Sequence, residues 1–243
     1  ADQEQNRYFS AKRTILNDNN LPELNLATGT QTVSSSASHW ATAGFFGRVN
    51  YDYKGIYLLE VNGRYDSSSK FPLDQQWGFF PSMSAGYRFS EEAYFEPIRD
   101  IVSNGKLRFS FGEVGNDNIG SYSFIPTIGS IAANNMYWTT GSNKLAAANM
   151  PELVSSDLSW ETVRTLDVGI DLGFLNNSIM VGFDWFQRDT KDMIAYAAAL
   201  PDVLGADAPL TNAGSLRTRG WELSASWNKR FGEVNLYVNG ILS

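Results

Sequence analysis

Apolar and polar residues alternate along this chain with a period of two, and no other feature restricts its fold as strongly. From Ala41 to Tyr53 every second residue is apolar, aromatic or glycine, and the residues between them include Thr42, Arg48 and Asp52. Successive side chains of a β-strand point to opposite faces, so this pattern predicts a strand with one apolar and one polar face. The same pattern predicts strands at residues 57–65, 77–90, 106–112, 161–174, 179–188 and 217–230, and one that begins at 234. We therefore expect an all-β chain, an antiparallel meander of about eight long strands.

The connections between these strands alternate between short and long. The tight turns are Lys54-Gly55, Asn176-Asn177 and Phe231-Gly232. The long, polar connections are residues 67–76, 116–159 and 191–215. Residues 90–105 lie on the short side but are longer, and we expect them to contain a helical turn. Short turns at one end and long loops at the other are typical of outer-membrane β-barrels, with the periplasm at the short end.

A soluble β-sandwich also alternates and also contains hairpins, so periodicity alone leaves both architectures open. Three features favour the barrel. The strands are about ten residues or longer, as in membrane barrels. Aromatic residues gather near both strand ends, as two bilayer interfaces would require. The polar face carries many charges, which suits a water-filled lumen. We expect the lumen to be faced by Arg48, Glu60, Arg64, Asp184, Arg188 and Glu222, and lipid by Leu59, Val61, Val168, Ile170, Val181 and Leu223.

The composition argues against several classes of function. The chain of 243 residues has a net charge of −7 and a pI near 4.8, and it lacks the Lys and Arg clusters that nucleic-acid binding requires. It has no cysteine, which excludes disulfides and thiol chemistry. Its one histidine, His39, lies in a serine-rich stretch that we expect to be an exposed loop. We therefore expect no enzyme activity, no catalytic residue, no metal site and no cofactor.

The two kinds of apolar targeting segment are also missing from the sequence. Residues 1–10 are polar throughout, so they do not form a secretion signal. The longest apolar stretch, residues 194–200, is far shorter than the roughly 18 residues that a transmembrane helix needs. We interpret the chain as an internal fragment that would meet a membrane through its strands.

Three polar motifs resemble known sites but fit them poorly. Residues 115–121 (GNDNIGS) have the spacing of a phosphate loop but lack its lysine. Residues 116–118 offer oxygen ligands for calcium, yet no glutamate follows at the required distance. Asp184, Asp189 and Asp192 suggest a glycosidase pair, but Asp184 and Asp189 would face opposite sides of an unbroken strand. Turns and solvated loops explain all three better.

Six sequence blocks, in order from Gly47 onward, resemble the barrel of the SusC/RagA family of TonB-dependent outer-membrane transporters. They are GRVNYDYKGIYLLEVNGRYDSSSKFP (47–72), WGFFPSMSAGYRFSEE (77–92), KLRFSFGEVGND (106–117), LSWETVRTLDVGIDLGFLNN (158–177), GFDWFQRDTKDMI (182–194) and LPDVLGADAPLTNAGSLRTRGWELSASW (200–227). The resemblance implies an arc of a 22-stranded transmembrane barrel whose lumen is plugged. We expect the plug and the remaining strands to lie outside this chain. In this interpretation residues 1–38 are an extracellular-loop segment and residues 39–243 are a partial transmembrane β-barrel.

The function that the resemblance implies is import of oligosaccharides, peptides or other large nutrients through the outer membrane of a Gram-negative bacterium. The implied partners are a SusD-like surface lipoprotein that acts as a lid, the TonB complex, and outer-membrane lipid. In the longest loop, adjacent aromatic and amide side chains suit sugar recognition, and we expect substrate contact at Tyr137, Trp138, Asn134 and Asn135. A soluble, secreted β-sandwich that binds carbohydrate is the alternative, and a passive porin is a third possibility.

Overall fold

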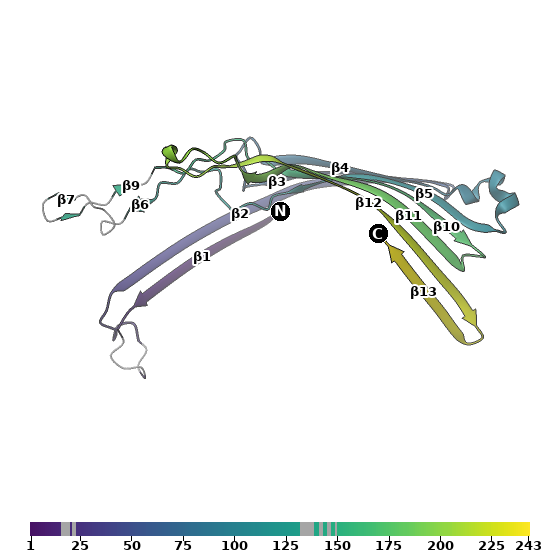
Figure 1. The fold of residues 1–243 in the computed structure, drawn as a ribbon, viewed down its shortest axis with the longest axis horizontal. Coiled ribbons are helices and arrows are strands. Elements are labelled where there is room, and N and C mark those ends of the chain that lie inside the picture. Colours follow the sequence, from purple (N-terminus) through teal and green to yellow (C-terminus); the bar gives the residue numbers. More distant parts are fainter. Residues whose placement is uncertain (16–19, 21–22, 132–138, 141–142, 145–146, 149) are drawn as a thin grey trace.

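One curved, nine-stranded antiparallel sheet dominates the chain, in the order β1-β2-β3-β4-β5-β10-β11-β12-β13 (Figure 1). The computed structural model describes residues 1–15, 20, 23–131, 139–140, 143–144, 147–148 and 150–243. The strands of the sheet are β1 (Asp2–Arg13), β2 (Gln31–Tyr53), β3 (Tyr57–Ser68), β4 (Trp77–Tyr87), β5 (Val102–Asn116), β10 (Glu161–Phe174), β11 (Ile179–Tyr196), β12 (Leu210–Phe231) and β13 (Val234–Leu242). Four short strands form two small ribbons: β6 (Ser130–Ile131) with β9 (Ala147–Ala148), and β7 (Thr139–Thr140) with β8 (Asn143–Lys144).

The expected antiparallel meander is confirmed, with one strand more than the sequence pattern indicated. The additional strand is β1, which pairs along its whole length with the first half of β2, from Asp2 opposite Thr42 to Arg13 opposite Gln31. Its sequence, DQEQNRYFSAKR, is mostly polar on both faces and almost fully exposed, so no alternation marks it. Residue 38, where we expected a loop segment to give way to barrel, lies inside β2. His39 likewise lies in β2, opposite Gln5, and not in a loop.

The turn between β2 and β3 needs an unusual backbone conformation. Lys54 and Gly55 have φ angles of 57° and 65°, and the backbone N–H of Gly55 donates to Oδ1 of Asp52 at 2.8 Å. Two consecutive positive φ values define the tight hairpin turn that matches the twist of the strands. A Cβ atom is disfavoured in this conformation, most of all a β-branched one.

Replacing Gly55 with valine is therefore expected to cost about 1–2 kcal/mol of stability. The measurement is equilibrium unfolding of the full-length protein in lipid or detergent. Lys54→Asn is the matched control, because asparagine tolerates positive φ, and it should leave stability unchanged. A Gly55→Val protein as stable as the parent would contradict this description of the turn.

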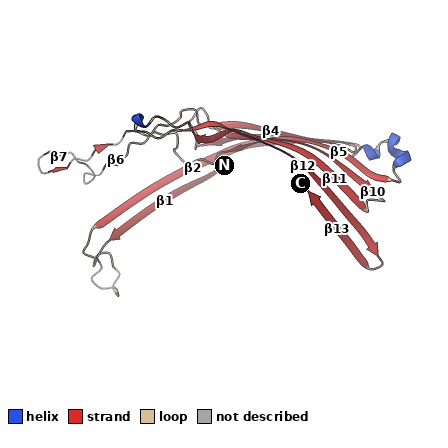
Figure 2. Cartoon of the chain, in the orientation of Figure 1, coloured by secondary structure: helices blue, strands red, loops and turns tan. Residues whose placement is uncertain are grey.

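The expected helical turn is confirmed between β4 and β5, where two 3-10 helices lie, η1 (Phe89–Glu91) and η2 (Ala93–Ile98). Phe95 is buried there, with its ring 5.2 Å from that of Phe89. The hydroxyl groups of Tyr87 and Tyr94 are 2.8 Å apart, and this hydrogen bond raises the pKa of Tyr94 to about 12. Figure 2 shows these helical turns at the end of the sheet opposite to the ribbons of β6–β9. We call the two ends the short-turn end and the long-loop end.

The strands are staggered steadily in one direction. One ladder of directly paired residues runs through Tyr57, Tyr87, Leu107, Ile170, Phe183 and Leu223. Tyr57 is the first residue after the turn at the short-turn end, Ile170 lies four residues before the strand end at Phe174, and Leu223 lies eight residues before the end at Phe231. Such a progressive shift accompanies the tilt of strands in a barrel wall.

The apolar face of the sheet is uncovered. Among the described residues, no second sheet packs against it, and its members include exposed large side chains such as Val49, Tyr65, Phe79, Val168 and Trp221. A soluble sandwich would bury this face against another layer. Among these residues, too, no helix is long and apolar enough to cross a membrane.

Candidate functional site

The strand pairing sorts the two sets of predicted residues onto opposite faces of the sheet. Residues that pair directly share a face, and one such ladder is Leu59, Ala85, Phe109, Val168, Trp185 and Trp221. Val61, Ile170, Val181 and Leu223 lie an even number of steps from it, so all six residues expected to face lipid lie on one face. The adjacent ladder, Glu60, Ser84, Ser110, Asp167 and Phe186, marks the other face. By the same rule that face carries Arg48, Arg64, Asp184, Arg188 and Glu222.

An arginine bridges two carboxylates at the middle of the polar face. Nε of Arg108 on β5 lies 2.7 Å from Oδ2 of Asp171 on β10, and Nη2 lies 2.8 Å from Oδ1 of Asp184 on β11. The three side chains are 33%, 30% and 24% exposed. Gly169 lies between them, and a Cβ there would stand 2.1 Å from Oδ1 of Asp184 and 2.8 Å from Nη2 of Arg108. The glycine therefore leaves the space that lets Arg108 reach the second neighbouring strand.

Removing Arg108 is expected to leave two half-buried carboxylates facing each other without a cation. We expect Arg108→Ala to cost roughly 1–3 kcal/mol, because both carboxylates lose a charged hydrogen-bond donor. The measurement is denaturant unfolding of the full-length protein in lipid or detergent at neutral pH. Arg64→Ala is the control, since Arg64 is 61% exposed and, among the described residues, pairs only with Asp66, and exposed pairs contribute about 0–1 kcal/mol. Equal costs for the two variants would contradict a special role for Arg108.

A shallow hollow of about 460 Å³ opens on the polar face beside this bridge. Its polar lining includes Asn50, Glu60, Ser84, Lys106, Arg108 and Asp167. Next to it, Nε of Arg48 donates to Oδ1 of Asn62 at 2.7 Å, and Nδ2 of Asn62 donates to Oε1 of Glu60 at 2.9 Å. Both charge signs and several amide and hydroxyl groups thus share one concave surface, a surface suited to water and polar solutes.

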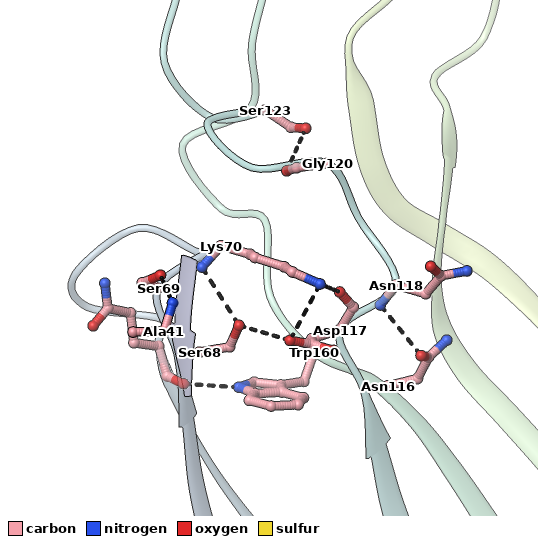
Figure 3. A network of polar contacts seen from close by, with 11 residues as sticks. Ala41, Ser68, Ser69, Lys70, Asn116, Asp117, Asn118, Gly120, Ser123 and Trp160 are labelled. Carbon is pink, nitrogen blue, oxygen red and sulfur yellow. Dashed lines mark hydrogen bonds and ion pairs between the residues drawn. The ribbon is translucent and has the colours of Figure 1, made fainter. Parts of the chain in front are cut away.

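At the long-loop end, the β3–β4 connection is fastened to the ends of β5 and β10 (Figure 3). Ser68 Oγ donates to Asp117 Oδ2 at 2.8 Å, and Nζ of Lys70 lies 3.1 Å from the carbonyl oxygen of Asp117 and 3.6 Å from its Oδ2. Nε1 of Trp160 donates to the carbonyl oxygen of Gln76 at 2.9 Å. We call this unit, residues 68–76 with Asp117, Leu158 and Trp160, the loop clasp.

The centre of the loop clasp is the best-buried part of the described sheet. Phe71 and Leu158 are both 0% exposed, and Phe80 is 6% exposed. The ring of Trp160 lies 5.3 Å from Phe71 and 5.4 Å from Phe80. Trp160 is therefore part of this cluster.

The structure also bears on two of the three polar motifs. Asp117 already binds Ser68 and Lys70, which leaves its carboxylate neutralised by an ammonium group and not free for calcium. Among the described residues no group of three or more His, Cys, Asp and Glu side chains is arranged to hold a metal. Asp184 pairs with Arg108 on the polar face, whereas Asp189 pairs with Arg217 on the apolar side of the sheet. The two carboxylates thus face opposite ways, as their spacing predicted.

The expected substrate contacts Tyr137, Trp138, Asn134 and Asn135 lie outside the described residues. Two features of the site escaped sequence reasoning. Arg108 and Asp171 alternate with apolar neighbours and so belong to the polar face, but only the register brings them together. The sequence gives a weaker signal for the loop clasp. Phe71 lies within one long connection, and Trp160 directly follows another.

Comparisons by sequence match this chain to TonB-dependent receptors. A family model described as TonB dependent receptor-like, beta-barrel, matches residues 2–242. The TonB-dependent receptor SusC of Bacteroides thetaiotaomicron is 34% identical over 184 residues, which are 74% of this chain and 18% of that protein. The TonB-dependent receptor P26 of Formosa agariphila is 32% identical over 192 residues, 79% of this chain and 19% of that protein. The chain thus spans about a fifth of the length of these relatives.

Among solved structures, the RagAB peptide importer in its closed-closed state matches with a TM-score of 0.79 at 21% identity, covering 98% of this chain and 26% of that one. The open-open state of the same importer matches with a TM-score of 0.73. At this identity the match concerns the fold, and it places the nine-stranded sheet as an arc of a larger barrel wall.

Proposed function

Because this chain belongs to the TonB-dependent receptor β-barrel family, with SusC/RagA-like relatives, we propose that it is part of the wall of an outer-membrane importer of oligosaccharides or peptides. Its polar face lines the lumen of the barrel and its apolar face contacts lipid. The observation that carries the proposal is the register, which gathers the six residues expected to face the lumen on one face and the six residues expected to face lipid on the other.

The positions of the aromatic residues on the apolar face support the proposal that this face contacts a lipid bilayer. On β3 the aromatic ends are Tyr57 and Tyr65, where Tyr57 stacks on Tyr87 at 5.1 Å and Tyr65 stacks on Trp77 at 4.7 Å. Eight residues of strand extend over about 27 Å, and a tilt of about 40° reduces this height to roughly 20 Å, close to the ~25 Å apolar band of such barrels. On β12 the corresponding residues are Trp221 and Phe231. Both bands follow the stagger of the strands, as two parallel membrane surfaces require.

The extracellular side corresponds to the long-loop end. The hairpin of β1 and β2 extends past the last residue pair of β2 with β3, Thr42 with Ser68, so Asp2–Arg13 and residues 31–38 stand beyond the neighbouring strands on that side. The partners in this proposal are a SusD-like surface lipoprotein over the long-loop end and the TonB complex, which acts through other parts of the full-length protein. RagAB is described as a peptide importer and SusC as a TonB-dependent receptor, which supports a nutrient as the cargo.

Site-directed spin labelling tests the two faces directly, since the chain contains no cysteine. In full-length protein with a single cysteine, labels at Leu59 and Val168 are expected to relax with oxygen dissolved in lipid. Labels at Ser84 and Ser110, on the adjacent ladder, are expected to relax with a water-soluble nickel chelate. Labels at all four positions with the same preference would overturn the assignment of faces.

Import itself is tested in cells that lack the full-length gene. Uptake of the cognate oligosaccharide or peptide is expected to return with the intact gene and to stop when a protonophore collapses the proton gradient. Uptake that persists with the protonophore would indicate a passive porin instead.

A further inference from the structure

Toward the long-loop end of β5, β10, β11 and β12, the residues on the apolar face change from apolar to charged or amide-bearing. Its last apolar residues on these strands are Phe111, Leu166, Trp185 and Trp221, which lie within one ladder step of one another. The next residues on the same face are charged or amide-bearing: Glu113, Arg164, Gln187, Asp189, Lys191, Arg217 and Arg219. We call these seven residues the outer belt.

Hydrogen bonds and ion pairs join six of the seven outer-belt residues into two groups. Nη2 of Arg164 lies 2.6 Å from Oε1 of Glu113, and its guanidinium lies 5.9 Å from the ring centre of Phe111. Nε of Arg217 lies 2.6 Å from Oδ1 of Asp189. Nε of Arg219 donates to Oε1 of Gln187 at 2.8 Å, and Nε2 of Gln187 donates to Oδ2 of Asp189 at 2.9 Å. The cations therefore stand directly on the rim of the apolar band.

The outer belt carries more positive than negative charge, although the chain as a whole is at −7. Glu113 and Asp189 neutralise Arg164 and Arg217, whereas Arg219 and Lys191 form no ion pair within the described part of the chain. Arg219 and Lys191 are also exposed. Two unpaired cations beside two exposed, paired guanidinium groups are an arrangement suited to a phosphate group, which arginine binds with paired N–H donors.

We propose that the outer belt binds the phosphate groups of a glycolipid in the outer leaflet, with the acyl chains lying against Phe111, Trp185 and Trp221. The inference rests on the proposed function, because it takes the apolar face to be in lipid. Continuity with the apolar band favours a lipid over a soluble anion, since the phosphate of a headgroup sits where hydrocarbon ends and water begins. Basic residues at the edge of a membrane-embedded surface bind anionic headgroups by this same charge complementarity.

The test is lipid binding by full-length protein in nanodiscs, with bisphosphorylated lipid A as the probe and native mass spectrometry as the readout. The combined variant Arg219→Gln with Lys191→Gln leaves both ion pairs intact and is expected to weaken lipid A binding roughly thirtyfold. The matched control, Arg48→Gln with Arg64→Gln, removes two cations from the opposite face and is expected to bind lipid A like the parent. A further comparison uses dephosphorylated lipid A. The parent protein is expected to bind it as weakly as the combined variant, which we call the belt variant, binds phosphorylated lipid A.

Three results would overturn the proposal: unchanged binding by the belt variant, an equal loss in the control variant, or equal binding of dephosphorylated lipid A. Full displacement of lipid A by millimolar inorganic phosphate would also overturn it, because the site would then be one for a soluble anion. Flotation of the protein with liposomes separates this outcome from failure of the proposed function. A protein that does not float with lipid contradicts the membrane barrel itself, whereas one that floats but ignores the phosphates contradicts only the outer belt.

Discussion

Val168→Arg is expected to lower the stability of the full-length protein in lipid by about 2–4 kcal/mol. Val168 lies in the middle of the apolar face, paired with Phe109 on one side and Trp185 on the other. In the proposed orientation an arginine there would have to hold its charge in hydrocarbon or distort the bilayer to reach water. The measurement is reversible unfolding in liposomes by urea or guanidinium, followed by tryptophan fluorescence.

The control for this prediction is Ser110→Arg, on the neighbouring ladder and on the opposite face. Ser110 pairs with Ser84 and Asp167, so an arginine there meets polar groups and a carboxylate, and the change in stability should stay within about 0.5 kcal/mol. Leu59→Arg should repeat the loss seen at Val168, because Leu59 belongs to the same ladder. If arginine costs as little at Val168 and Leu59 as at Ser110, the apolar face does not contact lipid.

The strands and their faces followed from sequence because each face is encoded locally. Alternation within a single strand, as in residues 41–53, fixes which side chains point together before any partner strand is known. The tight turns were equally local, since Lys54-Gly55 carries its own conformational preference. The strand β1 was not predicted because its few apolar residues, Tyr8, Phe9 and Ala11, do not make one continuous apolar face. It is held by backbone pairing with residues 31–42 of β2. In residues 31–41 of that partner segment the apolar residues are Val33, Ala37, Trp40 and Ala41.

The ion-pair bridge and the loop clasp depend on relations between strands that local patterns do not contain. Arg108 and Asp171 lie 63 positions apart, and a shift of one strand by two residues would preserve every alternation while separating them. The clasp requires in addition that two long connections fold back on the same strand ends. Sequence reasoning therefore identified the polar face as a candidate site but not the pairs of residues that organise it.

Phe71→Ala is expected to open the loop clasp. Phe71 is fully buried against Trp160, and removing such a ring from a packed site costs about 3–5 kcal/mol. The connection between β3 and β4 can detach without unfolding the sheet, because the strand ladders do not depend on it. A loss of 3 kcal/mol in this local equilibrium corresponds to more than about 100-fold faster amide exchange. Hydrogen–deuterium exchange of residues 68–76 in the full-length protein measures it.

Leu73→Ala is the matched control, because Leu73 belongs to the same connection but is 87% exposed. Its removal should change exchange in residues 68–76 by no more than about twofold, the effect of an ordinary surface substitution. The amides of β10 and β11 should exchange at parental rates in both variants, since the clasp lies beyond their ladders. Equal exchange in Phe71→Ala and Leu73→Ala would show that the buried ring does not hold the connection. Faster exchange throughout β10 and β11 would show that the clasp and the barrel wall unfold as one unit.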